Sequence, residues 1–434
     1  MGENCYIVQP ILPQGRSALK SAGTSSLRDP DARLEEAIGL SAAIDLNVLG
    51  GEIVNLRKVD AGVLFGKGVV ERLALLVEQD EIGLIIVNHA LSPVQQRNLE
   101  KALKCKVIDR SALILEIFGD RAQTKEGKIQ VELAALNYQR SRLVRSWTHL
   151  ERQRGGAGFM GGPGESQIEL DRRMIDEKIN RLKKQLVDVK RNRDLQRESR
   201  EKVPYPIVAL VGYTNAGKST LFNNITGADV FAQDLLFATL DPTMREVKLP
   251  NDRRIILSDT VGFISELPTH LIAAFRATLE QVLYADVILH VRDISAVDTA
   301  QQREDVISVL SDLGVAYEDN EKIIEVLNKT DLLAEDERPE TNIDNRRVAL
   351  SALEDQGVQD LLQLIQDILA KEHKLYSFTL SPAAGEAQSW LYNHGHVLTY
   401  QINNDNHRID LTVNLSDADF GRFRQRFSIE PNER

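Results

Sequence analysis

The segment GYTNAGKS, residues 212–219, limits what this chain can fold into more than any other feature. It fits the pattern of a glycine, four residues and then Gly-Lys-Ser, and the apolar run Ile207–Val211 comes directly before it. Glycines at these positions let the backbone wrap around phosphate oxygens, and successive N–H groups form an anion-binding nest. The segment therefore predicts a strand, a phosphate-binding loop and a helix, set in a doubly wound α/β domain.

Lys218 and Ser219 end this P-loop and give it its chemistry. The Lys218 ammonium supplies a point charge to the β- and γ-phosphates, and the Ser219 hydroxyl can ligate Mg²⁺. The motif DTVG (259–262) follows a second apolar strand, and its Asp259 is placed to hold Mg²⁺ through water. The N–H group of Gly262 can sense the γ-phosphate.

A threonine between these two motifs is a candidate switch residue. Thr239, in FATLD (237–241), can complete the coordination shell of Mg²⁺ while the γ-phosphate is present, and can release the ion after hydrolysis. Thr243 lies close by and stays open as an alternative.

The motif NKTD (328–331) decides between guanine and adenine. The Asp331 carboxylate can accept hydrogen bonds from N1–H and the exocyclic amine of guanine, and adenine lacks this pair of donors. The stem of Lys329 can cover the face of the base, and a backbone N–H at Ser351-Ala352 is expected to read guanine O6. The motif predicts a GTPase and not an ATPase.

Two residues depart from the pattern of a small GTPase. Phe263 follows DTVG, where a water-orienting glutamine is common, so we expect slow hydrolysis that a partner or an ion must assist. Asn215 lies within the P-loop. Its amide oxygen could hold K⁺ beside the phosphates in place of an arginine finger, or its side chain could only stabilise the loop, and both interpretations stay open.

The remaining chain divides by pattern into four parts. At 434 residues it is too long for one core. Residues 1–125 alternate helical and strand patterns, which predicts a parallel α/β sheet. The glycine pair in Gly66-Lys67-Gly68 before a helix could bind a second nucleotide but is more typical of a turn. We expect an N-terminal α/β domain, a helical hairpin, a G domain and a small α+β appendage, with bounds at 1–125, 126–202, 203–372 and 373–434.

The hairpin is predicted from heptad spacing. Leu136, Leu143 and Leu150 lie seven residues apart. A second run follows spacings of seven, four, three, four and three, with the residues Ile168, Ile175, Ile179, Leu182, Leu186 and Val189. GGAGFMGGPG (155–164) separates them and predicts a mobile loop between antiparallel helices.

The hairpin is also the basic part of an acidic chain. From residue 139 to 203 there are 17 lysines and arginines against 10 acidic residues, whereas the whole chain has a formal charge of −11. A basic hairpin tip could contact RNA phosphates, and a solvated helical face with a plain linker is the alternative.

Cysteine content and hydropathy bear on location. The two cysteines, Cys5 and Cys105, exclude a disulfide framework and favour a reducing cytoplasm. No run is long and apolar enough for a membrane span, so stable insertion is not expected, although a peripheral position at a membrane stays open. The free protein is expected to be monomeric.

Four stretches of the chain resemble the HflX family of ribosome-associated GTPases. They are QTKEGKIQVELA (123–134), GGPGESQIELDRR (161–173), FATLDPTMR (237–245) and DTVGFISELPTHLIAAFRATLEQVLYADVILHVRD (259–293). The resemblance covers residues 30–372 and implies an α/β domain, two long helices and a G domain of the TRAFAC class. It also implies GTP hydrolysis, binding of the large ribosomal subunit and its rRNA near the peptidyl transferase centre, splitting of stalled ribosomes and a link to stress recovery.

The resemblance also implies roles for individual residues, by their place in the motifs. Lys218, Thr239 and Gly262 take the catalytic roles, and Ser219 and Thr239 bind Mg²⁺. The residues implied to contact GTP or GDP are Gly212, Tyr213, Thr214, Asn215, Ala216, Gly217, Lys218, Ser219, Phe237, Ala238, Thr239, Leu240, Asp241, Asp259, Thr260, Val261, Gly262, Asn328, Lys329, Thr330, Asp331, Ser351, Ala352 and Leu353.

Two other functions stay open on the sequence. The first is an RNA remodeller driven by ATP bound to the N-terminal domain, although no P-loop occurs before residue 200. The second is a binding module with a vestigial nucleotide site, such as an adaptor in membrane-protein quality control, and the intact Lys218 and Asp331 argue against it.

Overall fold

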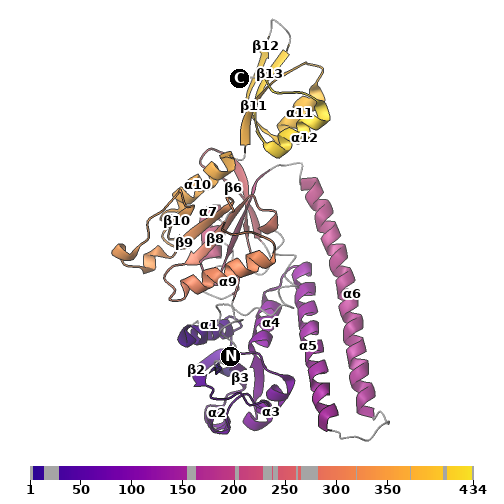
Figure 1. Cartoon of the computed structure of the whole chain (residues 1–434), viewed down its shortest axis with the longest axis vertical. Coiled ribbons are helices and arrows are strands. Elements are labelled where there is room, and N and C mark those ends of the chain that lie inside the picture. Colours follow the sequence, from indigo (N-terminus) through magenta and orange to yellow (C-terminus); the bar gives the residue numbers. More distant parts are fainter. Residues whose placement is uncertain are drawn as a thin grey trace.

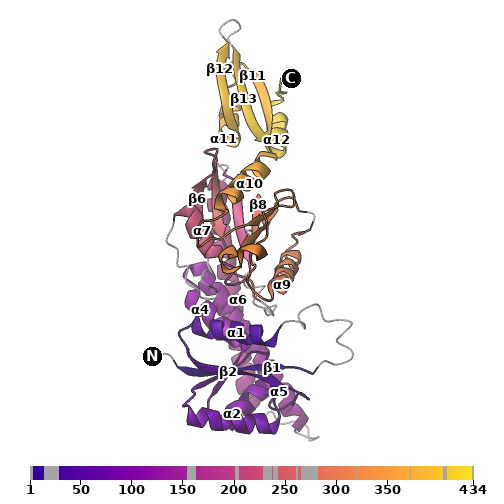
Figure 2. The same ribbon diagram turned by 90° about the vertical axis from the view of Figure 1, so that its left-hand side faces the viewer.

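The computed structural model describes the chain in segments. These are residues 3–13, 29–153, 163–200, 205–227, 237, 243–260, 262–264, 282–318, 320–371, 373–403 and 408–432. The N-terminal domain, the G domain and the C-terminal domain follow one another along the long axis, and two long helices run beside the first two (Figures 1 and 2).

The N-terminal domain is a four-stranded parallel sheet with helices between the strands. Its elements are β1 (Asn4–Ile11), α1 (Pro30–Ala42), β2 (Asn47–Asn55), α2 (Lys67–Gln79), β3 (Leu84–Val87), α3 (Pro93–Leu103), β4 (Lys106–Asp109) and α4 (Arg110–Arg121). The strand order is β2-β1-β3-β4, with every pair parallel. This confirms the expected parallel α/β fold. The sequence patterns did not predict strand β1, which lies inside the sheet between β2 and β3.

The strand order makes a topological switch point between β1 and β3. The chain leaves β1 toward β2 on one side, and then crosses to β3 and β4 on the other side. In open parallel sheets of this kind, the crevice beyond the carboxyl ends of two such strands is where ligands bind. Gln9 near the end of β1 and Asn88 just after β3 lie here, and both are buried.

Helices α5 (Lys125–Gln153) and α6 (Pro163–Arg200) form the expected antiparallel hairpin (Figure 1). The two helices share an apolar core, which confirms the predicted seam at Leu136 and from Ile175 to Val189. The residues of this core are Ile129, Leu133, Leu136, Ile175, Ile179, Leu182, Leu186 and Val189. Residues 155–162 of the predicted loop lie outside the described residues, as do the side chains of Leu150 and Ile168. The end of the predicted loop was wrong, because α6 already begins at Pro163. Proline is well tolerated at the first position of a helix, where its missing N–H has no helical partner.

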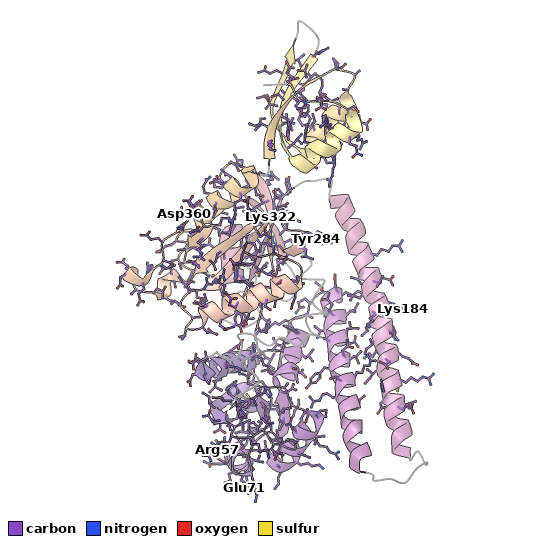
Figure 3. The ribbon with its side chains drawn as sticks, in the orientation of Figure 1. Arg57, Glu71, Lys184, Tyr284, Lys322 and Asp360 are labelled. Carbon is purple, nitrogen blue, oxygen red and sulfur yellow. The ribbon has the colours of Figure 1, made fainter. Side chains whose placement is uncertain are left out.

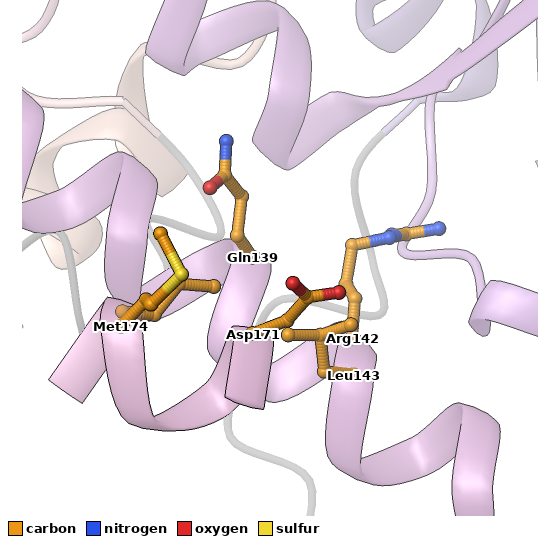
Figure 4. A pocket seen from close by; sticks show the side chains of 6 residues that line it. Gln139, Arg142, Leu143, Asp171 and Met174 are labelled. Atoms are coloured by element: carbon orange, nitrogen blue, oxygen red, sulfur yellow. The ribbon is translucent and has the colours of Figure 1, made fainter. Parts of the chain in front are cut away.

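A cavity of about 490 Å³ lies between the two helices, and Leu143, which the heptad spacing predicts to lie in the seam, is one of the residues that line it (Figure 4). The other lining residues are Gln139, Arg142, Asp171, Met174 and Ile175. This cavity belongs to the hairpin and lies apart from the P-loop.

The G domain is a six-stranded sheet in the order β10-β9-β8-β5-β7-β6, with only β6 antiparallel to its neighbour among these pairs. Its elements are β5 (Ile207–Gly212), α7 (Lys218–Thr226), β6 (Thr243–Lys248), β7 (Arg254–Asp259), β8 (Val287–Asp293), α9 (Thr299–Asp312), β9 (Ile323–Asn328), the short helices η3 (Thr330–Leu332) and η4 (Glu335–Glu337), β10 (Arg347–Ala349) and α10 (Val358–Lys371).

Helices cover both faces of this sheet. On one face, α9 packs against β5 and β8. On the other face, α7 and α10 pack against the same two strands, through Phe222 and Ile365 among others. This is the doubly wound arrangement that the sequence predicts, and it brings the carboxyl ends of the parallel strands to one edge.

The C-terminal domain is a small α+β unit. Its elements are β11 (His373–Leu380), α11 (Gly385–His394), β12 (His396–Asn403), β13 (Arg408–Ser416) and α12 (Asp417–Phe427), with antiparallel strands in the order β11-β13-β12. The predicted alternation is confirmed, because Ile409, Leu411 and Val413 are buried in its core. Within the described residues, no helix has the length and hydropathy to cross a membrane.

Candidate nucleotide-binding site

The P-loop joins β5 to α7 and needs glycine at two of its positions. Gly212 has φ of 153°, and a Cβ atom there would lie 2.1 Å from the carbonyl oxygen of Val291. Gly217 has φ of 87°, and its Cβ would lie 2.2 Å from the amide nitrogen of Asn328. The loop therefore follows β8 and the end of β9 so closely that any side chain would displace it.

Lys218 is buried at the centre of this loop. Its Nζ donates a hydrogen bond of 2.7 Å to the carbonyl oxygen of Tyr213. Burial lowers the pKa of Lys218 to about 8, and the nearby Asp259 carboxylate opposes this shift. An anionic phosphate beside the ammonium would offset the unfavourable burial of the charge.

Ser219 and Asp259 meet where a metal would be needed. The Ser219 hydroxyl donates a hydrogen bond of 2.8 Å to Oδ2 of Asp259, which is fully buried at the end of β7. A hydroxyl and a carboxylate are hard oxygen donors of the kind that Mg²⁺ prefers. These residues fit Mg²⁺, with Ser219 as a direct ligand and Asp259 near enough to act through water. Thr260 next to them is buried, and its hydroxyl donates to the Leu210 carbonyl.

The segment after DTV lies along the P-loop. The Phe263 N–H donates to the Gly212 carbonyl at 3.0 Å, and the Thr214 N–H donates to the Phe263 carbonyl at 2.7 Å. A Cβ atom on Gly262 would lie 3.1 Å from Lys218 Nζ, so this glycine is next to the predicted phosphate site. The Phe263 ring is buried in an apolar cluster with Val282 and Val306, in keeping with the expectation that it cannot orient a water molecule.

The base-reading motif is braced against the P-loop through Asn328. Its Nδ2 donates to the Ala216 carbonyl at 2.8 Å, and its Oδ1 accepts from the Ala352 N–H at 3.0 Å. Asp331 accepts a hydrogen bond of 2.6 Å from the Ser351 hydroxyl. The structure thus brings together the P-loop, NKTD and the segment at Ser351, which are far apart in sequence.

The outer members of the predicted base site differ in their surroundings. Lys329 is held by an ion pair of 2.8 Å with Asp293. Thr330 is buried, whereas the Leu353 side chain is 78% exposed. The sequence analysis did not predict Asp293 as a site residue. Its position at the end of β8, on the same sheet edge as NKTD, could have indicated it.

Several predicted site residues cannot be located. Ala238, Thr239, Leu240, Asp241 and Val261 lie outside the described residues, so the assignment of Thr239 as switch and metal ligand stays a prediction. Asn215 is exposed with φ of 59°, and in the described part of the chain its side chain makes no hydrogen bond. The loop-stabilising interpretation of Asn215 thus finds no support there.

The nucleotide loops contact the N-terminal domain at three points. Tyr213 from the P-loop, Phe237 from FATLD and Ile264 after DTVGF are buried in one apolar cluster with α1 and α4. The Phe237 ring packs edge-on against Phe118 of α4, with 4.8 Å between ring centroids. The Tyr213 hydroxyl donates to Glu36 of α1 at 2.6 Å. This interface could not be inferred from the sequence.

The glycine pair in Gly66-Lys67-Gly68 lies on the surface of the N-terminal domain, at the end away from the G domain. Helix α2 begins at Lys67, whose side chain is 90% exposed and pairs at 3.5 Å with Glu71 (Figure 3). This favours the interpretation of Gly66-Lys67-Gly68 as a turn.

Comparison with known proteins matches most of the chain to three family models. They are described as "GTP-binding GTPase N-terminal" over residues 31–119, "GTP-binding GTPase Middle Region" over 121–200 and "50S ribosome-binding GTPase" over 207–329.

Individual relatives named GTPase HflX are similar over most of their length. The protein of Magnetococcus marinus is 49% identical over 393 residues, which are 90% of this chain and 89% of the relative. The protein of Escherichia coli is 46% identical over 331 residues, 75% of this chain and 76% of the relative. Among solved structures, a GTP-binding protein from Sulfolobus solfataricus in complex with GDP is 23% identical, with a TM-score of 0.45, over 86% of this chain and 99% of its own.

Proposed function

The chain belongs to the HflX family and is a GTPase, and from this premise we propose that it is a switch that binds the large ribosomal subunit and dissociates stalled ribosomes, as part of recovery from stress. The family model that matches residues 207–329 describes a 50S ribosome-binding GTPase, which supports the choice of partner. The observation that carries the proposal is the burial of Tyr213, Phe237 and Ile264 in one cluster with the N-terminal domain. Movement of the nucleotide loops would then move the N-terminal domain, to which the hairpin is attached.

The hairpin is fastened to the N-terminal domain by a polar cluster. The Tyr138 hydroxyl of α5 donates to Oδ1 of Asp109 at 2.9 Å, and Arg142 pairs with Oδ2 of Asp109 at 3.4 Å. Asp109 also caps α4, through the Ala112 N–H. A rotation of the N-terminal domain would therefore carry α5 and α6 with it.

The exposed face of the hairpin suits rRNA. Arg172, Arg181, Lys183 and Lys184 are exposed on α6 (Figure 3 labels Lys184). Basic side chains along a helix bind phosphates and set the position of a protein on RNA. We place the glycine-rich tip of the hairpin, with the arginines beside it, against rRNA.

In the proposed cycle, Lys218 and the P-loop amides bind the phosphates, and Asp331 and Ser351 bind guanine. GTPases of this kind use Mg²⁺, which supplies charge neutralisation at the phosphates. Ser219 would ligate it, and Asp259 would hold it through water. Thr239 and Gly262 would respond to the γ-phosphate, and K⁺ at Asn215 would replace a missing cationic side chain.

Hydrolysis by the free protein is then expected to be slow, because the Phe263 ring is buried and offers no polar group to a water molecule. Contact with the ribosome would complete the site and accelerate hydrolysis and release. We place this cycle in the cytoplasm, with the free protein as a monomer. Cys5 and Cys105 are both free thiols, which suits a reducing compartment.

Sucrose-gradient sedimentation with ribosomes tests the proposal. The protein should move with large subunits in the presence of a non-hydrolysable GTP analogue and stay at the top with GDP. With Lys218→Ala, sedimentation should no longer differ between the two nucleotides, because the variant lacks the ammonium group that neutralises the charge of the phosphates. Equal sedimentation with both nucleotides, or none with either, would refute the switch.

The alternative of an ATP-driven RNA remodeller is not favoured. The switch point of the N-terminal sheet, where a nucleotide would be expected, holds the buried side chains of Gln9, Asn88 and Arg110. A fragment ending near Lys202 that bound ATP would revive this alternative.

A further inference from the structure

A polar link joins the N-terminal domain to the P-loop. Glu36 on α1 and Tyr213 are 177 residues apart in sequence, yet Glu36 Oε1 accepts a hydrogen bond of 2.6 Å from the Tyr213 hydroxyl. The Glu36 side chain is 11% exposed and Tyr213 is 5% exposed. A hydrogen bond to a carboxylate in such a shielded place is strong and directional.

Glu36 is itself held in place by buried groups at the switch point of the sheet. Its Oε2 pairs at 3.3 Å with Arg110, whose side chain is 5% exposed. Arg110 donates to Oδ1 of Asn88 at 2.7 Å, and the Asn88 amide nitrogen donates to Gln9 Oε1 at 2.6 Å and to the Arg33 carbonyl at 3.1 Å. The carboxylate is thus fixed to β1, β3 and α4 at once. Such a network keeps one arrangement because each member loses partners if any member moves.

Tyr213 is equally constrained on the other side of the link, through its backbone. Its carbonyl oxygen accepts the 2.7 Å hydrogen bond from Lys218 Nζ and a weaker one of 3.3 Å from the Ala216 N–H. The same residue forms a parallel bridge with Phe263. The place of Tyr213 therefore sets the place of the ammonium group, of the turn of the P-loop and of the segment that follows Gly262.

We propose that Glu36 is a positioning residue for GTP hydrolysis: it holds the Tyr213 hydroxyl, and through Tyr213 it fixes the carbonyl that keeps the Lys218 ammonium at the phosphates. Neither Glu36 nor the hydroxyl needs to touch GTP for this. Misplacement of a catalytic group by about 1 Å lowers rates by roughly 100-fold, so a small tilt of Tyr213 is enough to be measured. The inference concerns GTP hydrolysis by the protein alone and does not depend on ribosome binding.

The alternative is that the hydroxyl is only a satisfied buried group that helps the two domains adhere. In that case its removal would lower the unfolding temperature and leave turnover unchanged. The two roles differ in whether kcat changes at saturating GTP.

The test is a double-mutant cycle on the full-length protein with Tyr213→Phe, Glu36→Gln and both together. Tyr213→Phe keeps the ring in its apolar cluster and loses only the hydroxyl. Each single variant should lower kcat roughly 10-fold at saturating GTP, with KM changed less than about twofold, because the P-loop amides still bind the phosphates. The double variant should be no slower than the slower single variant, because Tyr213→Phe already removes the hydroxyl whose hydrogen bond Glu36→Gln weakens.

Tyr138→Phe is the matched control. Tyr138 also donates its hydroxyl to a carboxylate, Asp109 at 2.9 Å, and lies beside Arg142. This hydroxyl fastens the hairpin, and the ring, which packs against the same apolar cluster as Tyr213, is kept in the variant. It should lower the unfolding temperature about as much as Tyr213→Phe and leave kcat at the parental value. Parental kcat in a folded Tyr213→Phe protein, or losses of kcat that add up in the double variant, would overturn the proposal. If Tyr213→Phe did not fold, Glu36→Gln alone would decide by the same split between kcat and KM.

Discussion

The Ser351 hydroxyl donates a hydrogen bond of 2.6 Å to Oδ1 of Asp331, and so joins the loop after β10 to the loop after β9. A carboxylate oxygen has two lone pairs, so Oδ1 can still accept a hydrogen bond from guanine. The bond fixes the plane of the carboxylate. The Ser351 side chain, expected from the sequence only to flank a backbone N–H that would read O6, therefore also supports the carboxylate that we expect to read N1–H and the amine.

Replacing Asp331 by asparagine should change which base is bound. The amide of Asp331→Asn offers a donor where guanine also presents a donor, so GTP affinity should fall by at least about 100-fold and xanthosine triphosphate should become the better ligand. Competition against a fluorescent guanine nucleotide measures both affinities. Ser351→Ala serves as the control: it should weaken GTP only severalfold and leave guanine preferred. Equal GTP affinity in Asp331→Asn and the parent would remove Asp331 from base recognition.

Potassium should accelerate hydrolysis if Asn215 holds a cation. Rates measured in KCl and in NaCl at equal ionic strength should differ severalfold in the parent, because K⁺ would place positive charge beside the phosphates. Asn215→Ala should erase the difference, whereas Asn215→Asp, which keeps an oxygen ligand, should retain it. A parent protein that hydrolyses GTP equally fast in both salts would contradict this role.

His290 should make the G domain sensitive to acid. It is buried in β8 with Nδ1 2.6 Å from the Tyr317 hydroxyl, and Arg292, Arg303 and Glu325 face the same space. Burial lowers the pKa of His290 to about 3. The unfolded chain therefore binds one more proton between about pH 6.5 and pH 3, and this part of the stability is lost as pH falls through that window.

Between pH 7 and pH 5 the expected loss from this one group is about 2 kcal/mol in the free energy of opening of β8. Urea-dependent hydrogen exchange of the amides in Val287–Asp293 measures it, and His290→Gln, which does not titrate, should abolish most of the loss. The amides of β3 in the N-terminal domain provide an internal control. An unchanged pH dependence in His290→Gln would place the acid-sensitive group elsewhere.

Shortening the hairpin tip should separate ribosome splitting from GTP hydrolysis. Replacing residues 155–162 by a short Gly-Ser turn leaves the seam between Leu136 and Leu182 and the whole G domain untouched, so intrinsic hydrolysis should stay at the parental rate. Splitting should fall strongly, because the glycines and Phe159 could no longer approach bases and the arginines could no longer hold phosphates. Light scattering of intact ribosomes follows the reaction. A shortened protein that splits ribosomes as fast as the parent would reduce the segment to a linker.

Sequence periodicity predicted the elements whose signals are local. The strand before the P-loop, the helix after it and the seam from Ile175 to Val189 all follow from spacings within one turn or one heptad. The motif NKTD and the segment at Ser351 were also identified, because each is contiguous in the sequence, and their role in reading the base stays a prediction. For the same reason the general fold, including the C-terminal α+β unit, could be inferred before any contact was known.

Contacts between distant segments could not be predicted in this way. Nothing in the sequence around Asn4–Ile11 says that it pairs with β2 on one side and β3 on the other, since pairing depends on the partners. Likewise, Glu36 looks like any charged residue of an amphipathic helix until Arg110 and Tyr213 are placed beside it.

The length of α6 has a mechanical consequence. Its 38 residues make a rod about 57 Å long, since each residue of an α-helix adds 1.5 Å. A rotation of about 10° around one end of such a rod displaces the other end by about 10 Å, roughly the thickness of a helix. Shifts of an ångström or two at the loops that touch the N-terminal domain, close to the pivot, would thus become movements at the tip large enough to separate two surfaces. In the proposed cycle the hairpin would act as a lever, and the displacement of its tip would increase with the number of residues in α6.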